Sequence, residues 1–140
     1  MITDIQIEQA IRNIRKDADA YHEHNDCVRI AYQWLDAQVK IKNPCSRFYP
    51  VKHLIEKWAG RYVSTSDVKI AAYLHPDITG NYPTFNISSR LTEPSLSRLE
   101  GLAQAFTQPN YRKGHNPKIY KNHEDSAVPN AKLTGRGTES

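Results

Sequence analysis

The sequence contains few of the residues that mark secreted proteins. Its 140 residues include two cysteines, Cys27 and Cys45, and a single methionine. Two cysteines are too few to hold a small secreted scaffold together, because such scaffolds depend on several disulfides. Cys27 falls within an apolar helical pattern, so we expect a small buried side chain there. The sequence does not decide whether the two cysteines form a disulfide.

Long apolar segments are also lacking. No apolar run approaches the roughly 20 residues that a membrane-spanning helix needs. No charged segment followed by an apolar one opens the chain, as it would in a secretory signal. These absences predict a soluble, cytoplasmic protein that has no membrane partner.

The motifs of common enzyme classes are missing as well. The sequence has no nucleophile motif, no glycine-rich phosphate-binding loop and no pair of carboxylates at a catalytic spacing. We therefore predict that the protein is not an enzyme and needs no cofactor.

The sequence does contain strong helical patterning. Apolar residues recur at helical spacing as far as residue 106, and no alternating run is long enough to build a sheet. The hydrophobic fraction of 39% is lower than is usual for globular domains, which favours a folded body with a polar extension. We predict a single all-α domain of about six helices over residues 1–106. Residues 107–140 should form a polar, basic tail that is extended or ordered by a partner.

Local signals define the first two helices. Thr3 and Gln6 have the spacing of a capping box, which predicts a helix from there to about residue 21. Asn25 or Asp26 is the expected cap of a second helix that runs to about residue 40. That helix is apolar over most of its circumference, so we expect it at the centre of the core.

Two further helices follow. Pro50 suits the first turn of a third helix, and Gly60 suits its C-terminal cap. Ser64 or Ser66 is the expected cap of a fourth helix, with Asp67 favourably placed in its first turn.

The C-terminal half of the body suggests a function. After the fourth helix, residues 75–83 contain the prolines and glycine of a tight turn. We then expect a short helix over residues 84–91 and a last helix from Pro94 to residue 106. This order resembles, at motif level, the helix-turn-helix and winged-helix class of DNA-binding proteins. The turn is longer than that class uses, and a helix stands where a winged variant has a β-hairpin.

The resemblance implies a recognition helix at residues 84–91 and supporting contacts to phosphates. Asparagine can pair with adenine and arginine with guanine, and lysines supply phosphate contacts. The outward-facing candidates are Thr84, Asn86, Ser88, Ser89 and Arg90, with Arg98 beyond them. The candidate phosphate contacts come from a basic stretch before the motif, and they are Lys40, Lys42, Arg47, Lys52 and Lys57. We predict a non-enzymatic DNA-binding regulator of transcription or replication.

The basic tail suggests an alternative function. Residues 107–140 carry six basic and three acidic residues, mixed with aromatic side chains that could lie along a partner. The candidate contacts are Tyr111, Arg112, Lys113, Lys118, Tyr120 and Lys121. The alternative is an inhibitor or adaptor of the phage or mobile-element type, such as an anti-defence protein, that binds a protein partner. A homodimer is compatible with either function.

Two metal-dependent interpretations are weaker. A zinc site would draw on His22, His24 and Cys27, with Cys45 or His53. Their spacing does not match the paired ligands of structural zinc, so a polar loop between helices is favoured. Residues 114–125 resemble HNH nucleases in composition, through His115, Asn122 and His123. The strand and helix that orient such residues are not evident, so we predict no metal site.

Overall fold

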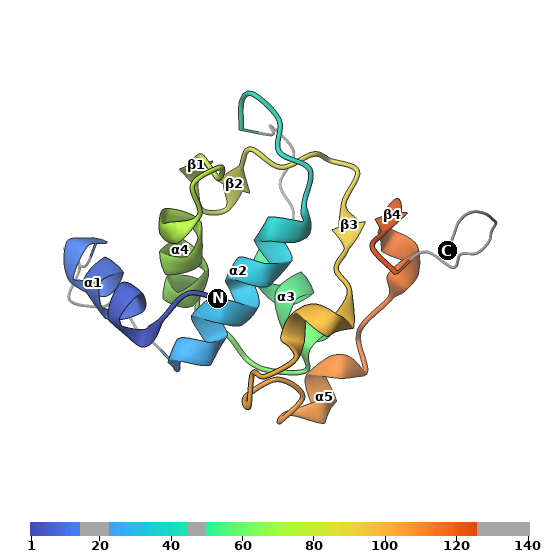
Figure 1. The fold of residues 1–140 in the computed structure, drawn as a ribbon. Helices are drawn as coiled ribbons and strands as arrows, with labels where there is room; N and C mark the ends of the chain where they lie inside the picture. The colour runs from blue at the N-terminus through green and yellow to red at the C-terminus, as the bar shows by residue number, and fades with distance from the viewer. Residues whose placement is uncertain (15–22, 45–49, 126–140) are drawn as a thin grey trace.

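The computed structural model describes residues 1–14, 23–44 and 50–125. Within these ranges the chain forms five α-helices, two 3-10 helices and two sheets of two short strands each. Helices predominate, as the sequence predicts, whereas the two small sheets were not predicted. The second helix lies in the middle of the molecule, between the fourth helix on one side and the third strand on the other (Figure 1). No helix in the described ranges combines the length and apolarity needed to cross a lipid bilayer.

Helix α1 (Asp4–Ile14) begins with the predicted capping box. The backbone N–H of Thr3 donates to Gln6 Oε1 at 2.8 Å, and the backbone N–H of Gln6 donates to Thr3 Oγ1 at 3.2 Å. Its buried residues, Ile7 and Ala10, lie on the face that packs against α4. The predicted continuation of this helix to residue 21 lies outside the described residues.

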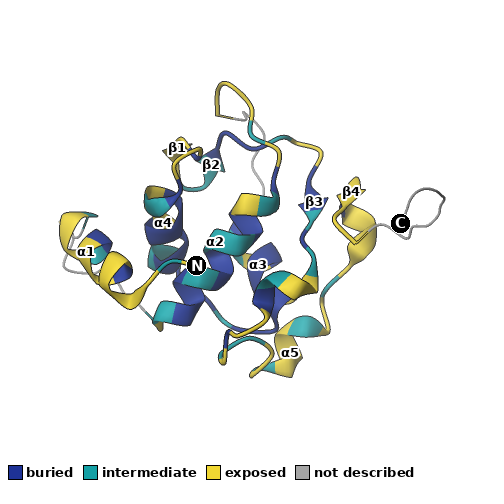
Figure 2. Cartoon of the chain, in the orientation of Figure 1, coloured by how far each residue is buried: buried dark blue, intermediate teal, exposed yellow. Residues whose placement is uncertain are grey.

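Helix α2 (Asn25–Ala37) is the central helix that the sequence predicts. It packs against α1, α3, α4 and the elements near residues 92–99, and parts of its ribbon have the dark blue of buried residues in Figure 2. The fully buried ones are Cys27, Val28, Ile30, Ala31, Trp34 and Leu35. The predicted cap was wrong: His24 Nδ1 accepts a hydrogen bond from the backbone N–H of Asp26 at 2.9 Å. The helix ends before Val39, which is exposed.

Helices α3 (Val51–Ala59) and α4 (Thr65–Leu74) follow their sequence signals. Gly60 closes α3 with a φ of 60°, in the left-handed region that favours glycine. The backbone N–H of Asp67 donates to Ser64 Oγ at 3.1 Å, and the backbone N–H of Ser64 donates to Asp67 Oδ2 at 2.9 Å. This reciprocal pair confirms that Ser64 opens α4.

The helix predicted over residues 84–91 is wrong. β1 (Gly80–Asn81) pairs antiparallel with β2 (Thr84–Phe85), and Ile87 then forms a β-bridge with Lys40. Asn86 is only 5% exposed, and its side chain accepts from the backbone N–H of Thr79 at 2.7 Å. The same amide donates to the carbonyls of Ile41 and Asp77 at 3.2 Å and 3.0 Å. Asparagine side chains that bond nearby backbone groups compete with helix formation, which accounts for the extended chain here.

The helix predicted from Pro94 to residue 106 is also wrong. Residues 92–99 form β3 (Thr92–Glu93) and one turn of 3-10 helix, η1 (Leu96–Leu99). Gly101 then adopts a φ of 82°. This left-handed turn takes the chain out of a helical path, and Leu99 and Leu102 both remain buried.

Residues 107–125 fold against the body instead of extending away from it. α5 (Pro109–Arg112) packs against α3, η2 (Pro117–Ile119) follows, and β4 (Asn122–His123) pairs in parallel with β3. Tyr120 is 3% exposed and belongs to the core. This segment therefore adds to the fold, which the polar sequence pattern did not predict. Residues 126–140 of the predicted tail lie outside the described residues.

Candidate nucleic-acid interface

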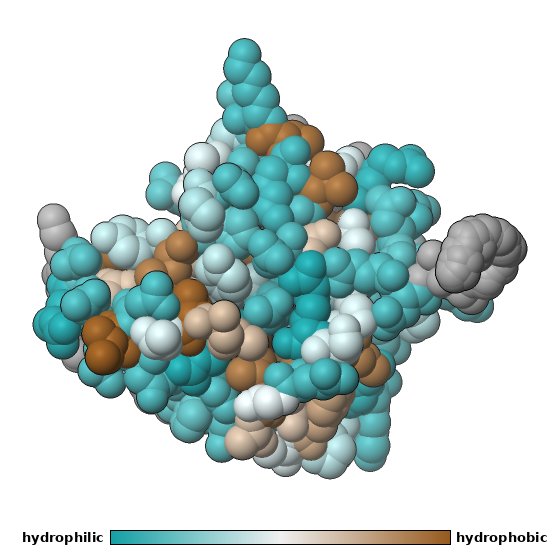
Figure 3. Space-filling model, viewed as in Figure 1, coloured by the Kyte–Doolittle hydropathy of each residue, from teal (hydrophilic) through white to brown (hydrophobic). Residues whose placement is uncertain are grey.

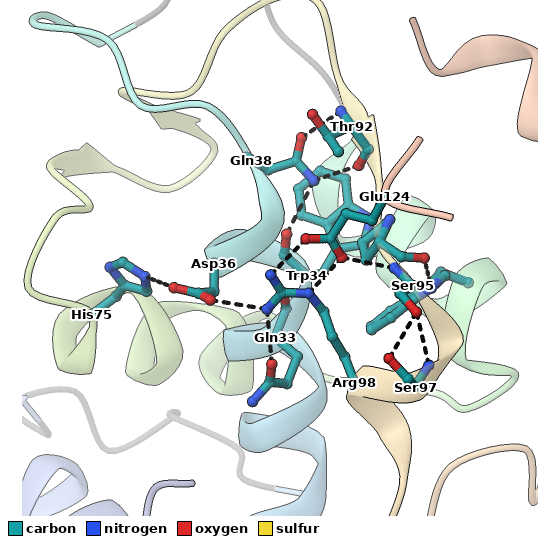
Figure 4. Close-up of polar contacts among 12 residues, drawn as sticks. Gln33, Trp34, Asp36, Gln38, His75, Thr92, Ser95, Ser97, Arg98 and Glu124 are labelled. Carbon is teal, nitrogen blue, oxygen red and sulfur yellow. Dashed lines mark hydrogen bonds and ion pairs between the residues drawn. The ribbon is translucent and has the colours of Figure 1, made fainter. Parts of the chain in front are cut away.

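A polar network on the second half of α2 anchors the C-terminal segment (Figure 4). The Arg98 guanidinium donates to Asp36 Oδ2 at 2.9 Å and to both oxygens of Glu124, at 2.6 Å and 2.7 Å. His75 Nε2 lies 2.8 Å from the other oxygen of Asp36. The hydrogen bonds from Arg98 lower the pKa of Glu124. Arg98, a predicted DNA contact, therefore joins α2 to the end of the described chain.

Two buried contacts complete this anchor. Gln38 Nε2 donates to the carbonyl of Thr92 at 2.8 Å, and the backbone N–H of Thr92 donates back to Gln38 Oε1 at 2.9 Å. Trp34 Nε1 donates to the hydroxyl of Tyr120 at 3.1 Å. Burial raises the pKa of Tyr120 to about 12. These bonds hold β3 and the C-terminal segment against the core helix.

Glu93 on β3 is held between two histidines of the C-terminal segment. His115 Nε2 lies 2.6 Å from Glu93 Oε2, and His123 Nδ1 lies 2.7 Å from Glu93 Oε1. Burial alone would raise the pKa of Glu93, but the hydrogen bonds from His123 and His115 outweigh it, so the pKa is lowered. Both histidines were singled out by the sequence, and their partner Glu93 was not. The three side chains fasten the segment after α5 to β3.

A pocket lies between α3 and this fastened segment. We call it the tail pocket, and its volume is about 460 Å³. Its apolar lining comes mainly from Leu54, Leu91 and Ile119, and His115 and Asn116 add polar atoms. The full lining is Pro50, Leu54, Lys57, Leu91, Gly114, His115, Asn116, Ile119 and Tyr120.

Exposed basic residues line the tail pocket or adjoin its lining residues in sequence. Lys57 lines it, and the other four each adjoin a lining residue in sequence. We call this set the basic rim, and it consists of Lys57, Arg90, Lys113, Lys118 and Lys121. No member of the set forms a salt bridge with any residue that the structure describes. Figure 3 shows a mostly hydrophilic surface on the side of β3 and β4, whereas hydrophobic atoms gather over α1.

The structure separates the residues predicted for a recognition helix. Asn86 is buried, and Thr84 is half-buried with its hydroxyl donating to the carbonyl of Asn81 at 3.3 Å. Ser88 Oγ accepts from the backbone N–H of Arg90 at 3.1 Å. Ser89 and Arg90 are exposed, and Arg90 belongs to the basic rim. These residues share no helix, so they form no helical reading face.

The predicted phosphate contacts are also divided. Lys40 Nζ donates to the carbonyl of Asp36 at 2.7 Å, and Lys52 forms an ion pair with Glu56 at 2.8 Å. Lys42 is exposed on the loop after α2, and Arg47 lies outside the described residues. Lys57 is the member of this group that the fold brings beside the tail pocket.

The predicted partner-binding residues of the tail separate into anchors and exposed groups. Arg112 donates to the carbonyl of Trp58 at 2.8 Å, and Tyr120 is buried. The ring of Tyr111, which is 37% exposed, lies 6.4 Å from that of Tyr62. The exposed groups are Lys113, Lys118 and Lys121.

The residues considered for zinc serve other purposes where the structure describes them. His24 caps α2, Cys27 is fully buried, and His53 Nδ1 lies 3.1 Å from Glu56 Oε1. Burial raises the pKa of the Cys27 thiol to about 12, which disfavours the thiolate that zinc requires. His22 and Cys45 lie outside the described residues, so the possible disulfide is not described either. Among the described residues, no group of three acidic, histidine or cysteine side chains is arranged to hold a metal.

Comparison with protein-family models, curated proteins and solved structures finds no match to this chain. The candidate interface therefore rests on the residues of this chain alone. Sequence reasoning identified all five rim residues, but in three separate groups: Lys57 among the phosphate contacts, Arg90 in the recognition helix, and the three others in the tail. It missed the tail pocket, because Leu54, Leu91 and Ile119 come from distant parts of the sequence.

Proposed function

We propose that the protein is a non-enzymatic nucleic-acid-binding protein that contacts phosphates through the basic rim. The observation that carries the proposal is that five exposed basic residues, drawn from α3, the chain before β3 and the C-terminal segment, either line one pocket or directly adjoin a lining residue in sequence. Lysines and arginines that face solvent without internal partners can neutralise phosphates and release bound counterions.

Two acidic residues near the rim in sequence are engaged by internal partners, whereas Asp125 is exposed. Glu93 is bonded by two histidines, and Glu124 is bonded by Arg98. A negatively charged ligand that approaches the rim therefore meets cations that form no salt bridge with the described residues, while the carboxylates of Glu93 and Glu124 are already paired. This local balance favours anionic partners more strongly than the net charge of +4 for the whole chain indicates.

The proposal retains the predicted DNA-binding function and changes the surface that performs it. The side chain of Asn86 is hydrogen-bonded to Thr79 beside the β1–β2 hairpin, and that of Arg98 is bonded to Asp36 in the network that anchors the C-terminal segment. Contacts through phosphates alone carry little sequence information, so we expect binding with weak sequence preference.

A salt series tests this proposal. Fluorescence anisotropy with a labelled 12-nucleotide single strand and a matched duplex would give the dissociation constant at several salt concentrations. We expect the affinity to fall steeply with salt, and the double substitution Lys118→Ala/Lys121→Ala to reduce the slope of log affinity against log salt by about 1.4 on single strands.

The matched control removes two charges elsewhere. Arg12 on α1 and Lys69 on α4 are exposed, and neither lies in the tail pocket or its rim. Arg12→Ala/Lys69→Ala should leave the slope nearly unchanged. Equal losses in the two double variants would show that binding depends on overall charge and not on the rim. Absence of binding at low salt would overturn the function, and a protein that co-purifies in stoichiometric amount would favour the adaptor alternative.

A further inference from the structure

The tail pocket has apolar walls and polar lining groups that contacts with phosphates alone would leave unused. We propose that it holds one unstacked base of a single-stranded nucleic acid, while the neighbouring phosphates lie on the basic rim. This inference rests on the proposed function and specifies the form of its ligand.

The walls of the pocket suit a flat, weakly polar ring. Leu54 and Leu91 are 8% and 3% exposed and are held in place by the core, while Ile119 is 43% exposed at the opening. The volume of about 460 Å³ is within the range of pockets that bind small organic ligands, about 300–1,000 Å³. A bare phosphate would leave these apolar walls unused.

Two polar groups of the pocket have unused hydrogen-bonding capacity. His115 Nε2 pairs with Glu93 Oε2, and His115 Nδ1 has no partner among the described residues. The His115 side chain is only 8% exposed. Asn116 Oδ1 accepts from the backbone N–H of Lys118 at 3.0 Å, which leaves the Asn116 NH₂ group as a donor. A ring nitrogen and an amide NH₂ group can both hydrogen-bond to the edge of a nucleobase.

The position of Lys57 connects the pocket to the phosphates. A Cβ added at Gly114 would lie 3.1 Å from Lys57 Cε, so the lysine stem runs closely over this glycine. Lys57 therefore lies at the side of the pocket, against the segment that carries Lys113 and Lys118. A base in the pocket would have Lys57 beside it as a cation for a flanking phosphate.

This arrangement favours single strands over duplexes. In a duplex the faces of each base are covered by stacking and its edge is paired, so a base reaches a pocket only if it leaves the helix. In a single strand the base is already available, and contacts to base faces add to the phosphate affinity.

An abasic strand separates this inference from the proposed function. The intact 12-nucleotide single strand is compared, by anisotropy with the full chain, with a strand of equal length and charge whose internal positions all lack bases. We expect the abasic strand to bind about 5- to 150-fold more weakly, since one base contact contributes that factor. The duplex should also bind more weakly than the intact single strand.

A substitution at the pocket opening checks where the base is bound. Ile119→Ser removes an exposed apolar wall, and Ile5→Ser is the matched control on α1, where Ile5 is 66% exposed. The ratio of abasic to intact dissociation constants should fall towards one in Ile119→Ser and stay unchanged in Ile5→Ser. Circular dichroism confirms that both variants are folded.

The outcomes distinguish the two proposals. If intact and abasic strands bind equally with a steep salt dependence, the pocket inference is wrong and phosphate binding stands. If neither strand binds, the proposed function itself is wrong. If the abasic strand binds weakly but Ile119→Ser leaves the ratio unchanged, bases are contacted elsewhere and the tail pocket is not their site.

Discussion

The helical body of α2, α3 and α4 and the C-terminal segment of residues 107–125 lie against each other but are stabilised by different interactions. The body is held by fully buried apolar side chains such as Trp34, Leu35 and Trp58. The segment has one buried apolar side chain, Tyr120, and is otherwise held mainly by hydrogen bonds and ion pairs. Apolar burial responds little to pH and salt, whereas charged contacts respond to both. The candidate interface therefore lies on the region whose stability depends more strongly on pH and salt.

The largest expected effect is in the body. Leu35→Ala should lower the free energy of unfolding by about 2–5 kcal/mol, because Leu35 is fully buried and its removal leaves a cavity. Chemical denaturation monitored by tryptophan fluorescence measures this loss. Leu96→Ala, at a position that is 42% exposed, is the control and should cost much less. Similar losses in the two variants would contradict the assignment of α2 as the centre of the core.

A smaller effect is expected where the two regions meet. Tyr120→Phe keeps the ring but leaves the buried Trp34 Nε1–H without its acceptor, at a cost of about 1–3 kcal/mol. Hydrogen exchange should accelerate at Lys121 and Asn122, whose backbone N–H groups bond the carbonyl of Leu91. Tyr111→Phe is the control, since Tyr111 is exposed. Unchanged exchange in Tyr120→Phe would mean that the segment does not depend on this bond.

Acid should release the C-terminal segment before it unfolds the body. The folded-state pKa of Glu124 is lowered from 4.5 by Arg98. Its contribution is therefore complete above about pH 4.5 and is lost as the pH falls below that value. The pKa of Glu93 is lowered as well, so this carboxylate acts in the same direction.

The Trp34 indole N–H resonance, which reports the bond to Tyr120, is the measurement for this acid release. It should shift below about pH 4.5 while far-UV circular dichroism stays constant. Glu124→Gln should weaken docking by about 1 kcal/mol at neutral pH and reduce the shift. Glu100→Gln is the control, because Glu100 is exposed. Simultaneous loss of both signals would show that the two regions unfold together.

The smallest effect on stability is expected at the basic rim. Lys118→Ala/Lys121→Ala should change the free energy of unfolding by no more than about 0.5 kcal/mol, because both side chains are exposed and form no salt bridge with the described residues. Thermal denaturation measures this. A large loss of stability would mean that these lysines support the fold, and any loss of nucleic-acid binding could then no longer be assigned to direct contacts.

Helix predictions succeeded where short-range signals decided the structure. The capping pairs at Thr3 and Ser64, the glycine cap at Gly60 and the apolar circumference of α2 all have the predicted roles. Each signal acts within a few residues of chain, so tertiary contacts are not needed to interpret it. The predicted DNA-binding function does not follow from these signals and stays a prediction.

The prediction errors lie where the local preference for a helix was weak. There, contacts with residues elsewhere in the chain determined the backbone conformation. Residues 84–91 have helical spacing at Ile87 and Leu91, but Asn86 bonds backbone groups at Ile41, Asp77 and Thr79. A buried polar side chain that bonds three backbone groups gives the extended chain an advantage that helical spacing does not reveal.

By itself, the sequence determined the first four helices, the central place of α2 and the basic character of the C-terminal segment. The tertiary structure alone decided that this segment packs on the body, because its docking depends on pairs such as Trp34 with Tyr120, 86 residues apart. The same long-range pairing creates the tail pocket and gathers the basic rim around it. Contacts between such distant residues have no periodic signature in the sequence, so they emerge only when the core has positioned both partners.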